Sequence, residues 1–461
     1  MSKRRVSKRK PDPAPVQLTI ESLSHEGRGV ARLDGKTQFV DGALPGEVVM
    51  ARRMRAHRTF DDCATIEVLE PSPDRIEPFC PHAKLCGGCS LQYMPQSLQL
   101  EHKQAVVLEL FKHAGAEAPK VVAPPLRSAP SGYRSKARMG ARYVFKKEET
   151  LVGFREQFSS FLADITQCPI LVPAVGERIT ELRACLSQLS VRQAVPQVEV
   201  AAGENAVILI IRHLEPLTNA DIELLEQFGR DHDFLMYGQA KGPDTVKPLA
   251  SYLDPEKGAD PAGELFYELP AFDLTMQFRP TDFTQVNMPL NREMLSQAMA
   301  WLQPQAEDSV LDLFCGLGNF TLPLARLSAQ VTGVEGSLAM TAQAEHNARK
   351  NGIDNVSFAA GDLFDIAALR NADGGAQWIR HYDKVLLDPP RAGAEDVVRS
   401  MGLFSPSAIL YVSCNPATLA RDAAILNAQG YRLRTLGIMD MFPQTAHVES
   451  MALFEKAGRS R

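Results

Sequence analysis

Long apolar segments are missing from this 461-residue sequence. No apolar run approaches the roughly 20 residues that a transmembrane helix needs, so we expect no membrane span. The basic N-terminus has no apolar core behind it, which argues against a secretory signal and favours a cytoplasmic protein. Net charge is also small, at −5, so a polyanion must be bound by local basic patches. Nothing in the sequence indicates an obligate protein partner.

The eight cysteines do not form the closely spaced framework of a small secreted protein. In a chain whose length predicts two to four domains, they indicate metal binding, a cluster or catalysis instead. Cys80, Cys86 and Cys89 have the spacing C-x5-C-x2-C, and two glycines before the last one let the chain wrap around one centre. Cys168 is the best candidate for a fourth ligand. Spacing alone leaves zinc and an iron–sulfur cluster open.

The first 70 residues combine a basic tail with a series of short strands. Residues 1–15 carry six lysines or arginines and then three prolines, a composition typical of a disordered tail. Between residues 16 and 70, β-rich runs separated by glycine turns predict a small OB-like barrel. Basic residues cluster on this barrel, which favours contact with nucleic acid over a merely solvated face. They are Arg52, Arg53, Arg55, His57 and Arg58.

Residues 71–270 predict a central α+β domain. Arg134, Lys136 and Arg138 alternate along one predicted strand, so we expect them to share a face. The stretch 142–147 adds an arginine, a tyrosine and two lysines. Basic residues interleaved with aromatic ones favour RNA binding over a solvated surface.

From residue 271 to 461, apolar runs alternate with helical segments about every 25 residues, a βαβ rhythm that predicts a parallel sheet covered by helices on both faces. Ligands of such sheets bind at the carboxyl ends of the strands. An acid stands at or just after four of these ends: Asp312, Glu335, Asp362 and Asp388.

The run 310–319 predicts a buried strand, a tight glycine loop and the start of a helix. Its G-x-G lacks the third glycine of a dinucleotide fingerprint, so the motif alone is weak. The set of acids is more specific. Glu335 can accept both hydroxyls of a ribose, and Asp362 can accept the amino group of an adenine. This set resembles the S-adenosylmethionine site of Rossmann-like methyltransferases.

Two later motifs predict the chemistry. The prolines of Asp-Pro-Pro-Arg (388–391) stiffen a loop whose acid can bond the edge of a base. Cys414 ends a predicted strand before Asn-Pro, so its thiol is expected to enter the cleft rather than to act as a small buried hydrophobe. Cys315, beside the glycine loop, is expected only to pack. Carbon 5 of uracil becomes nucleophilic once a thiolate adds at carbon 6, and a base must then remove the carbon 5 proton. Glu449 is the predicted base, and His447 a structural neighbour.

The runs 283–287, 312–319, 388–391, 413–416 and 447–449 resemble the RNA uracil-5-methyltransferase family. With the barrel, which resembles a TRAM domain, and the cysteine motif, residues 16–456 resemble its bacterial 23S rRNA branch. The resemblance implies methylation of uracil 1939 of 23S rRNA by S-adenosylmethionine. It also implies a [4Fe–4S] cluster rather than zinc, and a Rossmann-like methyltransferase domain at 271–461.

The resemblance also implies roles for individual residues. It implies Gln285, Phe314, Asn319, Glu335, Asp362 and Asp388 as contacts to the methyl donor or the target base. It implies Cys414 as nucleophile, Glu449 as base, and Cys80, Cys86, Cys89 and Cys168 as cluster ligands. Two alternatives stay open. One is the same chemistry on tRNA. The other is a non-catalytic, RNA-binding iron–sulfur sensor whose methyltransferase fold is vestigial.

Overall fold

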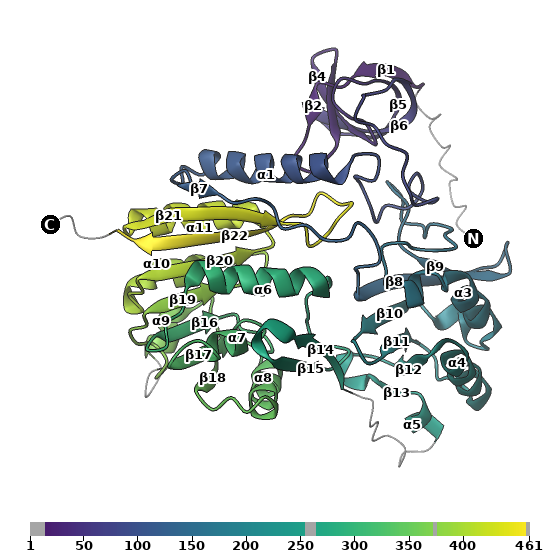
Figure 1. Ribbon diagram of the computed structural model, residues 1–461. Coiled ribbons are helices and arrows are strands. Elements are labelled where there is room, and N and C mark those ends of the chain that lie inside the picture. Colours follow the sequence, from purple (N-terminus) through teal and green to yellow (C-terminus); the bar gives the residue numbers. More distant parts are fainter. Residues whose placement is uncertain (1–13, 254–263, 372–375, 458–461) are drawn as a thin grey trace, which may run out of the picture. The chain divides into compact units, whose positions relative to one another are not determined.

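The computed structural model describes residues 14–253, 264–371 and 376–457 (Figure 1). Most of the predicted basic tail therefore lies outside the described residues. The chain divides into two compact units. The first comprises Met1–Gln99 with Gln444–Ala446, and the second Leu100–Pro443 with His447–Arg461. The boundaries expected at residues 70 and 270 stay predictions.

The first unit contains a curled six-stranded sheet in the order β1-β5-β6-β4-β3-β2. Small and branched side chains such as Leu18, Val40 and Val49 fill its core. Arg52 and Arg53 are exposed on β5, as predicted, whereas His57 bonds Asp62 at 3.0 Å and stacks on a phenylalanine. The strands are β1 (Val16–Thr19), β2 (Ser22–Leu23), β3 (Gly29–Leu33), β4 (Lys36–Asp41), β5 (Val48–Ala56) and β6 (Phe60–Glu70).

The second unit is built on an eight-stranded sheet in the order β18-β17-β16-β19-β20-β22-β21-β7. The central strands are parallel, and β22 runs antiparallel between β20 and β21. The chain leaves β16 first toward β17 and β18 and later returns to β19 and β20, so the order reverses beside β16. The strands are β7 (Val121–Val122), β16 (Ser309–Leu313), β17 (Gln330–Glu335), β18 (Val356–Ala360), β19 (Lys384–Leu387), β20 (Ala408–Ser413), β21 (Tyr431–Met439) and β22 (Glu449–Lys456).

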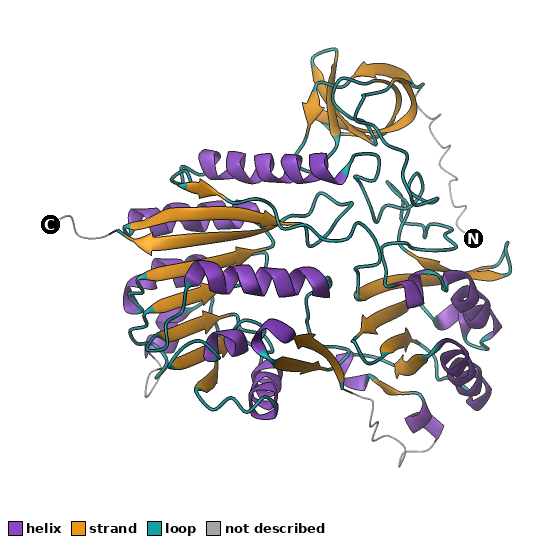
Figure 2. Ribbon diagram, viewed as in Figure 1, coloured by secondary structure: helices purple, strands orange, loops and turns teal. Residues whose placement is uncertain are grey.

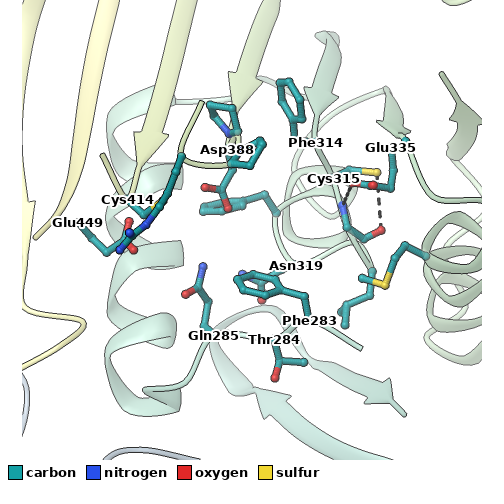
Figure 3. A pocket seen from close by; sticks show the side chains of 18 of the residues that line it. Phe283, Thr284, Gln285, Phe314, Cys315, Asn319, Glu335, Asp388, Cys414 and Glu449 are labelled. Atoms are coloured by element: carbon teal, nitrogen blue, oxygen red, sulfur yellow. Dashed lines mark hydrogen bonds between the residues drawn. The ribbon is translucent and has the colours of Figure 1, made fainter. Parts of the chain in front are cut away.

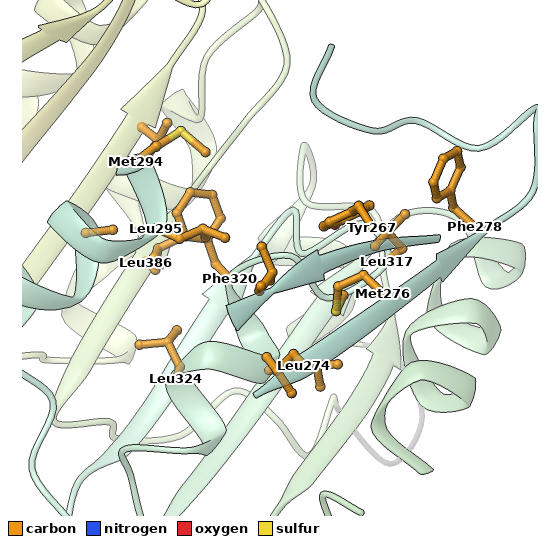
Figure 4. Close-up of a cluster of buried hydrophobic side chains, with 14 of the residues drawn as sticks. Tyr267, Leu274, Met276, Phe278, Met294, Leu295, Leu317, Phe320, Leu324 and Leu386 are labelled. Atoms are coloured by element: carbon orange, nitrogen blue, oxygen red, sulfur yellow. The ribbon is translucent and has the colours of Figure 1, made fainter. Parts of the chain in front are cut away.

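Two apolar cores cover the two faces of this sheet. Leu386 faces the core shown in Figure 4, whereas its neighbours Val385 and Leu387 face the other core. Burial on both faces explains why these strands are continuous apolar runs in the sequence. Helices cover the sheet (Figure 2). They are α1 (Gln96–His113), α6 (Met288–Leu302), α7 (Thr321–Ala325), α8 (Leu338–Lys350), α9 (Ile366–Asn371), α10 (Glu395–Arg399) and α11 (Pro416–Ala428).

The middle of the chain forms a second six-stranded sheet in the order β13-β12-β11-β10-β8-β9, and a separate two-stranded sheet, β14-β15, follows it. The strands are β8 (Lys136–Val144), β9 (Glu149–Gly153), β10 (Gln197–Ala202), β11 (Val207–Arg212), β12 (Phe234–Gln239), β13 (Lys247–Pro248), β14 (Leu265–Leu269) and β15 (Leu274–Phe278). The helices are α2 (Pro173–Gly176), α3 (Ile179–Gln188), α4 (Asn219–His232) and α5 (Ala250–Leu253). None of the described helices is long and apolar enough to cross a membrane.

The basic residues of β8 lie on one face, as predicted, because Ala137, Met139 and Ala141 between them are buried. Two of these basic residues are already engaged. Lys136 donates to the carbonyl of Asp282, and Arg138 pairs with Glu199. If this face binds RNA, the contact therefore depends on the basic residues farther along β8.

A buried ion pair fastens α1 to the end of β21. Lys103 and Asp440, exposed by 1% and 0% at their side chains, are 2.7 Å apart, and Lys103 also donates to the carbonyl of Phe442 at 3.2 Å.

We expect Lys103→Ala to lower the free energy of unfolding by about 3–5 kcal/mol, because it leaves the Asp440 carboxylate buried without this cation. Urea denaturation measures the loss. The double variant Lys103→Met with Asp440→Asn removes both charges and should recover most of it. An unchanged unfolding midpoint in the single variant would contradict this role of the pair.

Candidate active site

One cavity of about 630 Å³ opens where the parallel strands end, beside the reversal of strand order (Figure 3). Parallel sheets bind ligands at this position. All eight predicted donor-binding and catalytic residues line the cavity: Gln285, Phe314, Asn319, Glu335, Asp362, Asp388, Cys414 and Glu449. The structure thus brings these eight side chains together around one cavity.

The glycine loop after β16 forms one wall of the cavity. Phe314, Gly316 and Gly318 have φ angles of +65°, +55° and +94°, so the backbone turns in the left-handed region that favours glycine. The helix predicted to start in this loop begins only at Thr321, and α7 has five residues. This wall of the cavity is therefore made by the loop and not by the first turn of a helix.

Glu335 closes the next strand and holds the same loop. One carboxylate oxygen accepts the N–H of Gly316 at 3.2 Å, and the other accepts the N–H of Ser337 at 3.0 Å. Each oxygen keeps a second lone pair, so the carboxylate stays able to accept hydroxyl groups. Asp312 is fully buried behind the loop and bonds the hydroxyl of Thr321 at 2.6 Å. Asp312 therefore holds the loop through the residue that follows it and does not line the cavity.

Asn319 is oriented by two residues that the sequence did not reveal. Its amide exchanges two hydrogen bonds with Asn291 of α6, at 2.9 and 3.1 Å, and its oxygen also accepts from Tyr267 at 2.8 Å. Asn291 is fully buried among apolar neighbours on α6. A polar amide inside an apolar helix stripe is the signal that indicates such a partner, since buried polar groups are hydrogen-bonded.

Cys414 lies between the end of β20 and the start of α11. Asn415 caps this helix, accepting from the N–H of Ala417 at 3.2 Å, and Pro416 takes the first helical position. The Asn415 side chain also donates to the carbonyl of Arg391 at 2.8 Å, which ties the cysteine to the Asp-Pro-Pro-Arg loop. The Cys-Asn-Pro sequence thus places the thiol at a fixed turn beside Asp388.

Glu449 reaches the same cavity because β22 is inserted antiparallel to β20. Ser450 pairs with Ser413, so the beginning of β22 meets the carboxyl end of β20. Glu449 is 6% exposed and stands next to that pair. The predicted base and the predicted nucleophile, 35 positions apart in the sequence, thereby face one cavity (Figure 3).

Three acidic groups share this enclosed space, and burial acts on each. Burial raises the pKa of Asp388 to about 7. Burial, with repulsion from Asp388, raises the pKa of Glu449 well above its usual range, and Arg391 opposes the shift. Burial raises the pKa of the Cys414 thiol to about 11, and Glu449 and Asp388 contribute. At neutral pH, Cys414 and Glu449 therefore keep their protons and Asp388 is about half ionised, and a cationic ligand would favour release of these protons.

His447 packs against the rim of the cavity. Its Nδ1 lies 3.1 Å from an Arg391 nitrogen, and its ring is 5.8 Å from that of Phe442. Burial lowers its pKa, with further lowering from Arg391, Lys103 and Arg134. A neutral imidazole that accepts from Arg391 agrees with the predicted structural role.

The predicted cluster ligands fall in different units. Cys80, Cys86 and Cys89 lie on a loop of the first unit, and Cys168 belongs to the second. All four are half-buried. The N–H of Gly88 points at the Cys86 sulfur at 3.5 Å. Across the described ranges, no group of three or more His, Cys, Asp or Glu side chains is arranged to hold a metal ion. The cluster that the resemblance implies is therefore not shown, and the reaction is derived without it.

Comparison with known proteins assigns the family. Residues 267–457 match the model of the tRNA (Uracil-5-)-methyltransferase family, and residues 16–60 match the TRAM domain. Over 99% of this chain, it is 54% identical to the whole of a Hahella chejuensis protein named 23S rRNA (uracil(1939)-C(5))-methyltransferase RlmD. The chain belongs to the RNA uracil-5-methyltransferase family. It is therefore a methyltransferase.

Other relatives agree. An Alcanivorax borkumensis protein with the same RlmD name is 48% identical over 96% of this chain and 97% of its own length. A solved structure of the Pyrococcus abyssi tRNA (uracil-54, C5)-methyltransferase, in complex with S-adenosyl-L-homocysteine, covers 95% of this chain and 100% of that one. Its TM-score is 0.69 and its identity 22%, so this likeness concerns the fold. The predicted TRAM barrel and methyltransferase fold are confirmed.

Proposed function

We propose that this enzyme methylates carbon 5 of a uracil in 23S rRNA, at the position that the names of its relatives number 1939. S-adenosylmethionine is the methyl donor, and a covalent bond joins Cys414 to carbon 6 during the reaction. The observation that carries the proposal is the single cavity lined by both Cys414 and Glu449 and by the acids that end the parallel strands. Identity to the RlmD relatives over nearly the whole chain favours rRNA over tRNA.

The residues of the cavity suit the donor. Glu335 offers carboxylate oxygens to the ribose, Asp362 stands at the next strand end, and Phe314 supplies an aromatic face. Asn319, held by its amide pair, faces the same space. The donor, when bound, supplies an electrophilic methyl group on a sulfonium. Its positive charge complements the acids of the cavity.

The reaction follows from the placement of the thiol and the carboxyl. The Cys414 sulfur forms a bond to carbon 6, and the displaced electron pair of the ring moves toward the carbonyl oxygen at carbon 4. Carbon 5 then forms its bond to the methyl group while the bond between that methyl group and the donor sulfur breaks, which leaves S-adenosylhomocysteine. Glu449, ionised after it has released its own proton to solvent, takes the proton from carbon 5, the ring double bond reforms, and the bond from sulfur to carbon 6 breaks. Gln285 and Asp388 line the space that a flipped base would enter.

The thiol must first lose its proton to solvent, since burial raises its pKa to about 11. Arg391 already favours the thiolate, and so does the start of α11 just after Cys414. A bound sulfonium adds a third positive charge. We infer that donor binding and thiol activation are coupled through the charges of one cavity.

Donor affinity is expected to depend on pH. The pKa of Asp388 is raised to about 7 in the empty site, so the carboxyl is largely protonated at pH 6. A cationic donor favours the ionised form, so binding releases the proton. Affinity therefore increases as pH rises, by about tenfold between pH 6 and 8 for one proton. Calorimetry in buffers of different ionisation enthalpy measures both the affinity and the proton release.

S-adenosylhomocysteine is the matched control because its sulfur is neutral. It should show a weaker pH dependence than the donor, and Asp388→Asn should flatten the dependence for both ligands. Equal pH profiles for the two ligands would contradict the electrostatic coupling.

Labelling with radioactive donor tests the substrate. Incubation with unmodified 23S rRNA and with unmodified tRNA should label only the rRNA, at one uracil. Label in tRNA alone would favour the tRNA alternative. Absence of label in either RNA, with intact donor binding, would favour the sensor alternative.

We further propose, from the resemblance, that Cys80, Cys86, Cys89 and Cys168 hold a [4Fe–4S] cluster. The C-x5-C-x2-C spacing supports this. Anaerobically purified protein should show an absorbance band near about 400 nm that Cys86→Ser abolishes. One equivalent of zinc and no iron would refute the cluster.

A further inference from the structure

A second cleft lies on the middle sheet of the second unit and shares no lining residue with the active-site cavity. It measures about 310 Å³. Residues 142–146, at the end of β8 and in the turn to β9, form one side, and Leu151, Phe161 and Leu162 form the rest. The cleft is thus made by a hairpin and by the loop that follows it.

Two glycines let this loop pack on the hairpin. Gly140 and Gly153 are directly opposite each other on β8 and β9. A Cβ atom on Gly140 would lie 2.6 Å from Leu162, and one on Gly153 would lie 2.6 Å from Ile165. Any side chain at either position would push the loop away. The glycine pair therefore sets where Phe161 and Leu162 stand.

Charged groups hold the loop in place. Arg183, 4% exposed, lies 2.8 Å from Asp164 in the loop and 2.8 Å from Glu149 on β9. It also donates to the carbonyl of Ile165 at 2.6 Å. Lys147 of the turn pairs with Asp164 as well. Lys147 is therefore already paired with a carboxylate. The loop is held in place before a ligand binds, so binding would not have to include the entropic cost of ordering the loop.

The cleft presents large aromatic surfaces to solvent. Phe145 is 69% exposed and Phe161 63% exposed. Phe145 meets Tyr143 edge to face, with ring centroids 5.3 Å apart, and the guanidinium of Arg192 lies 5.0 Å from the centre of the Tyr143 ring. The contact with Tyr143 leaves the exposed Phe145 ring at the mouth of the cleft.

The exposed charge beside these rings is mainly positive. Arg142 and Lys146 line the cleft and are exposed. Among the described residues, neither forms an ion pair with a carboxylate, in contrast to Arg138 and Lys147 nearby. Glu148 is also exposed in the turn. Two available cations beside two exposed rings fit a ligand that carries both phosphates and flat aromatic groups.

We propose that this cleft is a second RNA subsite, which stacks an unpaired base on Phe145 and Phe161 while Arg142 and Lys146 contact the flanking phosphates. The subsite binds RNA outside the reacting uracil and so adds affinity and register without touching the chemistry. The proposal rests on the proposed function, because it takes the RNA substrate as the ligand.

Binding of a 23S rRNA fragment to the full-length protein tests the subsite. We expect Phe145→Ala and Phe161→Ala each to weaken RNA binding by about tenfold or more, with the KM for RNA raised and kcat at saturating RNA unchanged. Phe145→Tyr keeps the aromatic face and should bind normally, whereas Phe145→Leu keeps only apolar bulk and should not. Arg142→Gln should lower the slope of log affinity against log salt by about 0.7.

Matched controls lie on other elements. Leu214→Ala removes a side chain that is 65% exposed, and Lys350→Gln removes an exposed charge at the end of α8. Both should bind RNA as the unmodified protein does. Donor binding by calorimetry should be the same in every variant. If the unmodified protein methylates the fragment but Phe145→Ala and Phe161→Ala bind RNA with unchanged affinity, the subsite is overturned. Failure of the unmodified protein to label the fragment would instead overturn the proposed function.

Discussion

Replacement of Cys414 by alanine is expected to abolish methylation, with a loss of at least about 10⁴-fold in kcat. No other thiol can substitute, because the second cysteine of the cavity, Cys315, is 6% exposed and burial raises its pKa well above the usual range. Without a sulfur adduct at carbon 6, carbon 5 lacks the electron density to accept the methyl group. Turnover with radioactive donor and unmodified rRNA measures the loss.

The covalent bond itself is also testable. Unmodified protein should form a complex with 5-fluorouridine RNA that survives denaturing electrophoresis, because fluorine at carbon 5 cannot leave as a proton does. Cys414→Ala should form none, although it binds S-adenosylhomocysteine normally. Cys185→Ala is the thiol control, since Cys185 is buried in α3. A complex or full activity in Cys414→Ala would refute the covalent mechanism.

Replacement of Glu449 by glutamine is expected to stop the reaction after methyl transfer. Glutamine cannot take the carbon 5 proton, so carbon 6 stays bonded to Cys414. Natural uracil should then yield a stable complex of enzyme and methylated RNA, at no more than one methyl group per enzyme. Multiple-turnover kcat should fall by about 10²–10⁴-fold. Gel electrophoresis of the complex and counting of transferred label give the two readouts.

Glu455→Gln provides the matched control on the same strand. Glu455 pairs with Arg434 at 2.7 Å and lies six residues farther along β22. It should methylate normally and accumulate no complex. If Glu449→Gln turned over normally, another group would have to be the base, and His447 would be tested next.

The sheet could be predicted because its strands are buried on both faces. Continuous apolar runs ended at Asp312, Glu335 and Asp388 in the sequence, and β16, β17 and β19 end within one residue of these positions. The start of the helix after the glycine loop was predicted wrongly. Three residues with positive φ continue the turn, and the helix begins only at Thr321. Propensity alone does not show how far a glycine loop extends.

Contacts between residues on different helices, strands and loops could not be predicted from the sequence. The contact of Asn319 with Tyr267 joins positions 52 apart, and the Arg183 network joins a helix, a strand and a loop. Neither follows any local period. That Cys414 and Glu449 share a cavity could be predicted only through the motifs, since the insertion of β22 beside β20 is a property of the whole sheet.

The three residues Gln444–Ala446 belong to the first unit, although Pro443 and His447 belong to the second. The side-chain oxygen of Gln444 accepts from the fully buried Gln99 amide at 2.9 Å, and the backbone N–H of Gln444 donates to the Gln99 side-chain oxygen at 3.0 Å. The backbone carbonyl of Gln444 accepts the N–H groups of Ser90 and Leu91. During synthesis, the first unit therefore lacks these hydrogen bonds until Gln444 has been made. A fragment ending at Gln99 would keep the bonds of this amide to the carbonyls of Leu91 and Met94 but would leave the Gln99 side-chain oxygen without the N–H of Gln444.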